Sequence, residues 1–182
     1  WMLAFALRAD GWYLRQDIIW HKPNPMPESV RDRCTKSHEY LFLLSKNRKY
    51  YYDNEAIKEP VKQDWGTRNR DQGKYHNEGT GLQPHTGLTK SYTTKNKRSV
   101  WSITNKPYKG AHFAVFPPDL IEPCILAGSE RGDIILDPFM GSGTTGMVAK
   151  KHGRNYIGCE LHEDYASLQT DRIDSVPQQL ML

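Results

Sequence analysis

The sequence lacks long hydrophobic runs and has few cysteines. No apolar stretch approaches the roughly 18 residues of a membrane-spanning helix, and the first residues lack the basic-then-apolar pattern of a secretory signal. Its three cysteines form no Cys-x-x-Cys pair, which disfavours a disulfide framework and a four-ligand zinc site. We therefore expect a cytoplasmic protein with reduced thiols, no membrane contact and no bound metal.

The composition is that of one folded domain with helices and strands. Hydrophobic residues make up 37% and charged residues 25% of the 182 residues, and the net charge is +4. A chain of about 180 residues can bury close to 70% of its unfolded surface, so a substantial core is expected. Cys124 and Cys159 lie in apolar stretches and are predicted to belong to that core.

Positive charge is concentrated in the middle of the chain. Between Val61 and Gly110 there are ten lysines and arginines against three acids, a net charge of +7. The segment is rich in Gly, Thr, Asn and Gln, and its aromatic residues follow no helical or strand period. Basic residues interleaved with aromatics suit a nucleic acid backbone and its bases, and a solvated flexible linker is the alternative.

The flanking segments have regular patterns. Hydrophobic spacing, proline and glycine predict helices over residues 1–9, 118–128, 144–152 and 165–173. Short apolar runs predict strands over residues 17–20, 38–45, 50–52, 133–136 and 155–159. We expect the second and third of these strands to pair through a turn around Lys46–Arg48. Strand and helix alternate in the second half, which predicts a parallel sheet.

A glycine-rich turn between a predicted strand and a predicted helix is the best candidate ligand site. Gly141, Gly143 and Gly146 have the G-x-G-x-x-G spacing, in which glycines permit a sharp turn and the helix N-terminus attracts an anion. Glu160 ends the next predicted strand, where a carboxylate can accept hydrogen bonds from both ribose hydroxyls of an adenosine cofactor. No Lys-Ser/Thr pair follows the glycines, which excludes a P-loop. The short chain after Gly146 disfavours a nicotinamide-binding domain, whose strands mostly follow this motif.

Several segments resemble the DNA amino-methyltransferases, which modify N6 of adenine or N4 of cytosine. Residues Asp137-Pro-Phe-Met-Gly-Ser-Gly-Thr-Thr-Gly146, with 112–123 before and 158–161 after them, resemble the family's S-adenosylmethionine-binding part. Residues 11–27 and 38–46 resemble the later half of its catalytic region. The order of these segments is that of the circularly permuted β class.

The resemblance implies an α/β, Rossmann-like S-adenosylmethionine-dependent methyltransferase fold, present in part. Residues 1–60 would form the catalytic side, 61–110 a basic, loop-rich target-recognition insertion, and 111–182 the cofactor-binding part. The implied activity is methyl transfer to an exocyclic amine of a base flipped out of double-stranded DNA, as in restriction-modification systems. The implied cofactor site comprises Phe113, Pro117, Asp137, Pro138, Phe139, Gly141, Ser142, Gly143, Thr144, Thr145 and Glu160. The DNA contacts that we expect are Lys22, Asn24, Lys95, Lys97, Arg98 and Lys106.

One family motif is absent from the sequence. The catalytic tetrapeptide Asp/Asn/Ser-Pro-Pro-Tyr/Phe/Trp does not occur, and Phe116-Pro-Pro-Asp119 has the two prolines with different flanks. The catalytic residues are therefore unassigned, and we expect the chain alone to be inactive without an upstream segment or a partner chain that supplies the motif; the expected partners are double-stranded DNA and either a second copy of the chain or that upstream segment. Without the tetrapeptide, cytosine N4 is favoured only slightly over adenine N6. The alternatives are a non-catalytic DNA- or cofactor-binding subunit and a nicotinamide-dependent oxidoreductase.

Overall fold

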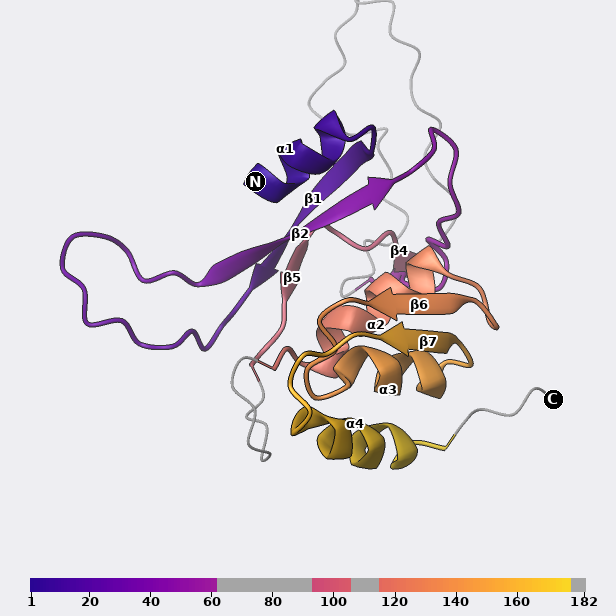
Figure 1. The fold of residues 1–182 in the computed structure, drawn as a ribbon. Coiled ribbons are helices and arrows are strands. Elements are labelled where there is room, and N and C mark those ends of the chain that lie inside the picture. The colour runs from indigo at the N-terminus through magenta and orange to yellow at the C-terminus, as the bar shows by residue number, and fades with distance from the viewer. Residues whose placement is uncertain (62–92, 106–114, 178–182) are drawn as a thin grey trace, which may run out of the picture. The chain divides into compact units, whose positions relative to one another are not determined.

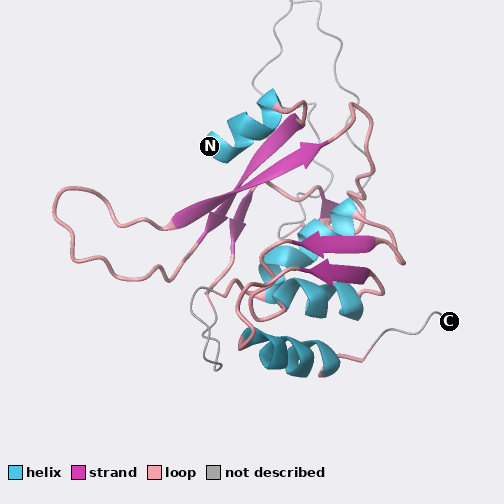
Figure 2. Cartoon of the chain, in the orientation of Figure 1, coloured by secondary structure: helices cyan, strands magenta, loops and turns pink. Residues whose placement is uncertain are grey.

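The computed structural model describes residues 1–61, 93–105 and 115–177. The chain divides into two compact units, one of Trp1–Ile57 with Arg98–Leu182 and one of Lys58–Lys97. The helices are α1 (Met2–Ala9), α2 (Pro118–Gly128), α3 (Thr144–Lys151) and α4 (Tyr165–Asp174). The strands are β1 (Tyr13–His21), β2 (His38–Ser45), β3 (Glu59–Pro60), β4 (Thr94–Lys95), β5 (Val100–Ser102), β6 (Ile134–Asp137) and β7 (Asn155–Gly158). Figure 1 labels these elements except β3, and Figure 2 separates helices from strands by colour.

The first unit contains a three-stranded sheet in the order β2-β1-β5. β1 and β2 are antiparallel, so that Tyr13 lies opposite Ser45 at one end and His21 lies opposite His38 at the other. β5 pairs in parallel with the last residues of β1. The predicted strand at residues 38–45 is confirmed, and its partner is the longer strand that precedes it in the chain.

The predicted strand at residues 50–52 is wrong. β2 is paired with β1, and the chain after β2 is drawn back toward the beginning of β1. Arg15 of β1 donates hydrogen bonds to the carbonyl oxygens of Asn47, at 3.0 Å, and Arg48. Its guanidinium also lies 4.8 Å from the ring centre of Tyr50. These contacts hold the chain after β2 beside the beginning of β1, and residues 50–52 pair with no strand of the described chain.

The predicted alternation of strand and helix in the second half is confirmed. β6 and β7 form a parallel pair in which Asp137 lies opposite Gly158, and α3 connects them. The helix α3 packs against this pair and also contacts α4 (Figure 1). We predicted a buried strand at residues 133–136, but Ile134 and Leu136 of β6 are each 63% exposed. Only the alternate residue Ile135 packs against the core beside α2 and α3.

The helix α2 packs against both groups of strands in this unit. Its Leu120 lies in a core cluster with Trp20 of β1 and Trp101 of β5. Its Ile125 lies in a second cluster with Val148 of α3. Because one short helix contributes to both clusters, it fixes the three-stranded sheet against the parallel pair that carries the glycine-rich turn.

The cysteines are free thiols, but they are less buried than the sequence predicts. Cys124 of α2 is half-buried, whereas Cys34 and Cys159 are exposed. Cys159 lies just beyond β7, where its N–H bonds to Asp137 and its carbonyl accepts the N–H of Met140. Its backbone therefore continues the sheet edge while its side chain faces solvent. Among the described residues, no helix is both long and apolar enough to span a membrane.

Candidate functional site

Asp137 joins the end of β6 to the first turn of α3. One of its carboxylate oxygens accepts the N–H of Phe139 at 3.0 Å, and the other accepts the hydroxyl of Thr145 at 2.5 Å. Thr145 is buried, with 4% of its surface exposed. The two ends of the glycine-rich turn are therefore held together by one carboxylate.

The turn between them needs glycine for its backbone conformation. Gly141 and Gly143 have φ angles of 52° and 83°, in the left-handed region that other residues rarely adopt. A Cβ at Gly143 would also lie 3.2 Å from the Cα of Gln169 and 3.3 Å from the side chain of Ile173. The sharp turn expected from the glycine spacing is therefore present, and it leads directly into the N-terminus of α3.

Glu160 binds the same turn from the end of β7. Its carboxylate accepts the N–H of Gly141 at 2.8 Å and the N–H groups of Leu161 and His162 at 2.9 Å. The bonds from His162 and Gly141, with a smaller contribution from Leu161, lower the pKa of Glu160 despite its partial desolvation. A carboxylate has about four acceptor positions, so a ligand can add one hydrogen bond without displacing a backbone donor.

Two residues of α4 also hold the turn, and the sequence analysis missed both. Gln169 donates to the carbonyl oxygen of Gly141 at 2.8 Å, and Arg172 donates to the hydroxyl of Ser142 at 2.7 Å. They are three positions apart, so both lie on one face of the helix. That pair of polar residues is the sequence signal that could have indicated them.

A hollow of about 370 Å³ lies beside the turn. It is lined by Phe116, by apolar residues of α2, by Leu136 and Asp137 of β6, and by Thr145. Phe116, before α2, and Asp137 and Thr145, at the two ends of the glycine-rich turn, therefore line one hollow of a size typical for small-molecule sites, whereas Glu160 is not among its lining residues.

The other residues predicted for the cofactor site differ in exposure. Pro117 is buried at the start of α2, and Ser142, Gly143 and Thr144 are buried in the turn. Pro138 and Phe139 are exposed, Phe139 to 85%. Phe113 lies outside the described residues.

The residues predicted to bind DNA are divided between several contacts. Lys22 forms an ion pair with Glu39 and lies 4.4 Å from the ring centre of Trp20. Asn24 exchanges two hydrogen bonds with the backbone of Asn105. Both side chains therefore make structural contacts at the carboxyl end of β1.

The basic residues of the central segment are described in part. In the second unit, β3 and β4 pair with Glu59 opposite Lys95, and the ammonium of Lys97 lies 3.6 Å from Glu59. Arg98, in the first unit, is exposed, and its carbonyl accepts the indole N–H of Trp101. Lys106 lies outside the described residues. Within residues 1–61, 93–105 and 115–177, no three His, Cys, Asp or Glu side chains are grouped as metal ligands.

The arrangement around the turn offers complementary groups to a nucleoside-like ligand. Glu160 supplies an ionised acceptor, the start of α3 supplies N–H groups and partial positive charge, and Phe116 and Leu136 supply apolar surface. A ligand with hydroxyls, an anionic group and an apolar ring would match this set. Of the two cysteines near the site, Cys159 is exposed beside Glu160, whereas the half-buried thiol of Cys124 lines the hollow.

Comparison with known proteins identifies the family. A family model described as DNA methylase, for N6 and N4 methylases, matches residues 2–171. The chain is 48% identical over 173 residues to the Type II methyltransferase M.XycI of Xanthomonas campestris pv. cyanopsidis, covering 95% of this chain and 48% of that protein. It is 51% identical over 173 residues to the Type II methyltransferase M.SmaI of Serratia marcescens, covering 95% and 50%. The chain thus spans about half the length of these relatives.

Solved structures of methyltransferases have the same fold. The crystal structure of an M1.HpyAVI–SAM complex matches with a TM-score of 0.62 and 26% identity, covering 94% of this chain and 68% of that one. The cytosine-N4-specific PvuII DNA methyltransferase matches with a TM-score of 0.66 and 19% identity, covering 98% and 57%, which supports the fold alone. The Rossmann-like α/β class predicted from the sequence is confirmed. The chain belongs to the N6/N4 DNA methylase family.

Proposed function

We propose that this chain binds S-adenosylmethionine and double-stranded DNA. We further propose that it takes part in the methylation of an exocyclic amine, cytosine N4 or adenine N6, in a restriction-modification system. The observation that carries the proposal is the unit of β6, the glycine-rich turn, α3 and β7, closed by the hydrogen bond from Gly141 to Glu160. Family membership supports the same function, because its members named above are Type II methyltransferases.

The residues around the turn fit the cofactor by the chemistry of their groups. The remaining acceptor position of Glu160 suits one ribose hydroxyl, and the second hydroxyl can share an oxygen or displace a backbone donor. The N-terminus of α3 suits the carboxylate of the methionine part. Phe116 and Leu136 offer an apolar wall for the adenine ring. When bound, S-adenosylmethionine supplies an electrophilic methyl group on its sulfonium.

Calorimetry tests cofactor binding and separates it from the nicotinamide alternative. The chain should bind S-adenosylmethionine and S-adenosylhomocysteine. NAD should displace neither ligand. Because one acid and one glycine turn can serve either cofactor, the competition is the discriminating measurement. Binding of NAD in preference to S-adenosylhomocysteine would contradict the proposal.

DNA binding is proposed for the basic central segment. Neutralising Lys95, Lys97 and Arg98 together should flatten the dependence of DNA affinity on salt, because each phosphate contact releases counterions. Fluorescence anisotropy with a duplex at several salt concentrations measures this slope. An unchanged slope would place the DNA contacts elsewhere.

Methyl transfer needs more than the described cofactor site. An exocyclic amine whose lone pair is delocalised into the base is a poor nucleophile, so acceptors must bind its hydrogens while it attacks the methyl group in line. The family's tetrapeptide would supply such acceptors and does not occur in the 182 residues. We therefore propose that the chain by itself binds cofactor without methylating DNA, which makes a binding subunit the second candidate function.

Transfer of a labelled methyl group distinguishes a methyltransferase from a binding subunit. The chain should show no turnover on unmethylated duplex DNA, whereas a longer chain that carries the tetrapeptide before Trp1 should methylate it. Digestion of the product to nucleosides identifies N4-methylcytosine or N6-methyladenine. Equal turnover by both chains would show that other residues of this sequence hold the target amine.

A further inference from the structure

The loop between β1 and β2, residues 22–37, is a long exposed segment that we call the arm. It exceeds the roughly 12–15 residues above which loops without secondary structure are uncommon and usually functional. Residues 31–36 are all exposed, and Met26 is 84% exposed. Figure 1 shows the arm extending away from the three-stranded sheet. A long ordered loop of this kind is a candidate functional segment.

The base of the arm is fixed to the sheet. The N–H of Lys22 bonds to the carbonyl of Ser37 at 2.8 Å, which closes the loop at its neck. The ammonium of Lys22 pairs with Glu39 of β2. Asn24 donates to the carbonyl of Asn105 at 3.1 Å and accepts the N–H of Asn105 at 3.0 Å. These contacts direct the arm outward from the carboxyl end of β1.

The outer part of the arm carries cations without internal partners. Arg33 lies 3.3 Å from Asp32 and 3.7 Å from Glu28, so its charge is matched within the arm. Arg31 and Lys36 make no hydrogen bond or ion pair with the residues that the structure describes. With two lysines and two arginines against two acids, the arm has a net charge of +2. Its unmatched charge is therefore available to an anionic partner.

The arm is also tied to the basic part of the chain. Asn105, which holds Asn24, directly precedes Lys106, and the segment from Val61 to Gly110 has a net charge of +7. An extended backbone of regularly spaced phosphates fits two cations held on one exposed loop.

We propose that the arm is a second DNA-contacting element, in which Arg31 and Lys36 bind phosphates. Asn24 is a positioning residue that fixes the start of the arm to the sheet. This inference rests on the proposed DNA binding of the chain, and it assigns contacts outside the central basic segment. The phosphate contacts contribute affinity and orientation and carry no base specificity. The ion pair of Lys22 with Glu39 makes Lys22 part of the arm's support.

The test compares two double variants with equal loss of charge. Arg31→Gln/Lys36→Gln removes the two unmatched cations of the arm. Arg48→Gln/Lys49→Gln removes two exposed cations after β2, at the opposite end of the same strand pair. Anisotropy with a duplex of defined length gives the dissociation constant at several salt concentrations. The arm variant should reduce the slope of log affinity against log salt by roughly 1.8, at about 0.9 per phosphate contact, and the control by much less.

A third variant tests the positioning role of Asn24. Asn24→Ala removes no charge, so it should weaken DNA binding severalfold at low salt while its salt slope falls by less than that of the arm variant. Asn24→Asp keeps the oxygen that accepts from Asn105 but replaces the donor with an acceptor and adds a negative charge, so it should recover none of the affinity. Unfolding curves of the two double variants should coincide with that of the parent chain, since the four replaced side chains are exposed.

The outcomes separate this inference from the proposed function. If the parent chain binds DNA and the arm variant keeps both affinity and slope, the arm is not a DNA contact and the proposed function stands. If both double variants lose the same slope, the effect is one of total charge and the inference fails. If the parent chain binds S-adenosylmethionine but no DNA, the inference and the proposed DNA binding fail together.

Discussion

The carboxylate of Glu160 accepts the backbone N–H of Gly141, nineteen residues earlier in the chain, at 2.8 Å. This bond makes the acid at the end of β7 and the glycine-rich turn after β6 one unit. Glu160 also accepts two further N–H groups from the residues that follow it. A ligand that binds Glu160 therefore acts on a carboxylate whose position is already fixed, and this reduces the ordering cost of binding.

Replacing Glu160 should weaken cofactor binding and loosen the turn. In Glu160→Gln, one carboxylate oxygen becomes an NH2 group, which cannot accept the N–H bonds that the carboxylate accepts. We expect the dissociation constant for S-adenosylmethionine to rise roughly tenfold or more, since bonds to a charged acceptor are the stronger ones. Calorimetry measures the change. Glu163→Gln, at an exposed acid three residues away, serves as the control. An equal loss in both variants would remove Glu160 from the site.

The hydrogen bond from Thr145 to Asp137 should stabilise the turn measurably. Thr145→Val keeps the shape of this buried side chain but leaves an oxygen of Asp137 without its donor. We expect the free energy of unfolding to fall by about 1–2 kcal/mol. Denaturation in urea measures it, and Thr145→Ser should retain most of the stability because it keeps the hydroxyl. If Thr145→Ser loses as much as Thr145→Val, the methyl group rather than the hydroxyl matters.

The sequence is sufficient for the parts of the site that are local in the chain. Asp137, Gly143 and Glu160 follow from the order of strand, turn, helix and strand, because parallel strands bring their carboxyl ends together. Gln169 and Arg172 could not be found in this way. Their contacts depend on where α4 packs, which is set by tertiary contacts such as that of Ile173 beside Gly143.

The errors in the fold have a similar origin. An aromatic run such as Tyr50–Tyr52 has strand propensity, but propensity does not show that Arg15 of β1 binds the chain between β2 and this run. Likewise, the apolar residues of β6 predict a strand that is buried on both faces. Among the described residues, only the face that carries Ile135 packs against helices. Burial depends on which neighbours cover a strand, and a hydrophobic pattern does not contain that information.

A side chain at Gly146 would require two neighbouring side chains to shift. A Cβ there would lie 2.7 Å from the terminal methyl of Met140 and 2.9 Å from the side chain of Ile173. Because Met140 is buried and Ile173 packs from α4, Gly146→Ala should overpack this contact and cost about 1–3 kcal/mol of unfolding free energy. Gly128→Ala is the matched control, since no atom lies within 4 Å of the new Cβ. Denaturation curves that shift equally for both would contradict the tight packing of α3 on Met140 and α4.

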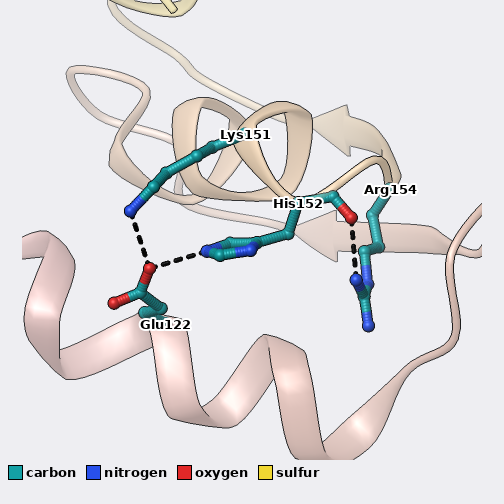
Figure 3. Close-up of polar contacts among 4 residues, drawn as sticks. All are labelled: Glu122, Lys151, His152 and Arg154. Atoms are coloured by element: carbon teal, nitrogen blue, oxygen red, sulfur yellow. Dashed lines mark hydrogen bonds and ion pairs between the residues drawn. The ribbon is translucent and has the colours of Figure 1, made fainter. Parts of the chain in front are cut away.

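The ion pair between α2 and α3 should make stability depend on pH. One oxygen of Glu122 accepts from Lys151 at 2.8 Å and from His152 at 2.6 Å (Figure 3). Burial by itself would raise the pKa of Glu122, but the hydrogen bonds from Lys151 and His152 outweigh it and lower the pKa. The stabilisation is therefore present above the pKa of the unfolded carboxyl group, about 4.3, and is lost as the pH falls through the lowered folded value.

Glu122→Gln removes this charge while keeping the side chain's size. At about pH 7 the variant should be less stable than the parent chain by about 1 kcal/mol, because the pair is only partly shielded from water. The difference should shrink toward zero below about pH 4, where the parent carboxyl group becomes protonated as well. Urea denaturation at a series of pH values measures both curves, with Glu163→Gln as the exposed control. A difference that stays constant down to acid pH would mean that Glu122 stabilises the helices by packing and not by its charge.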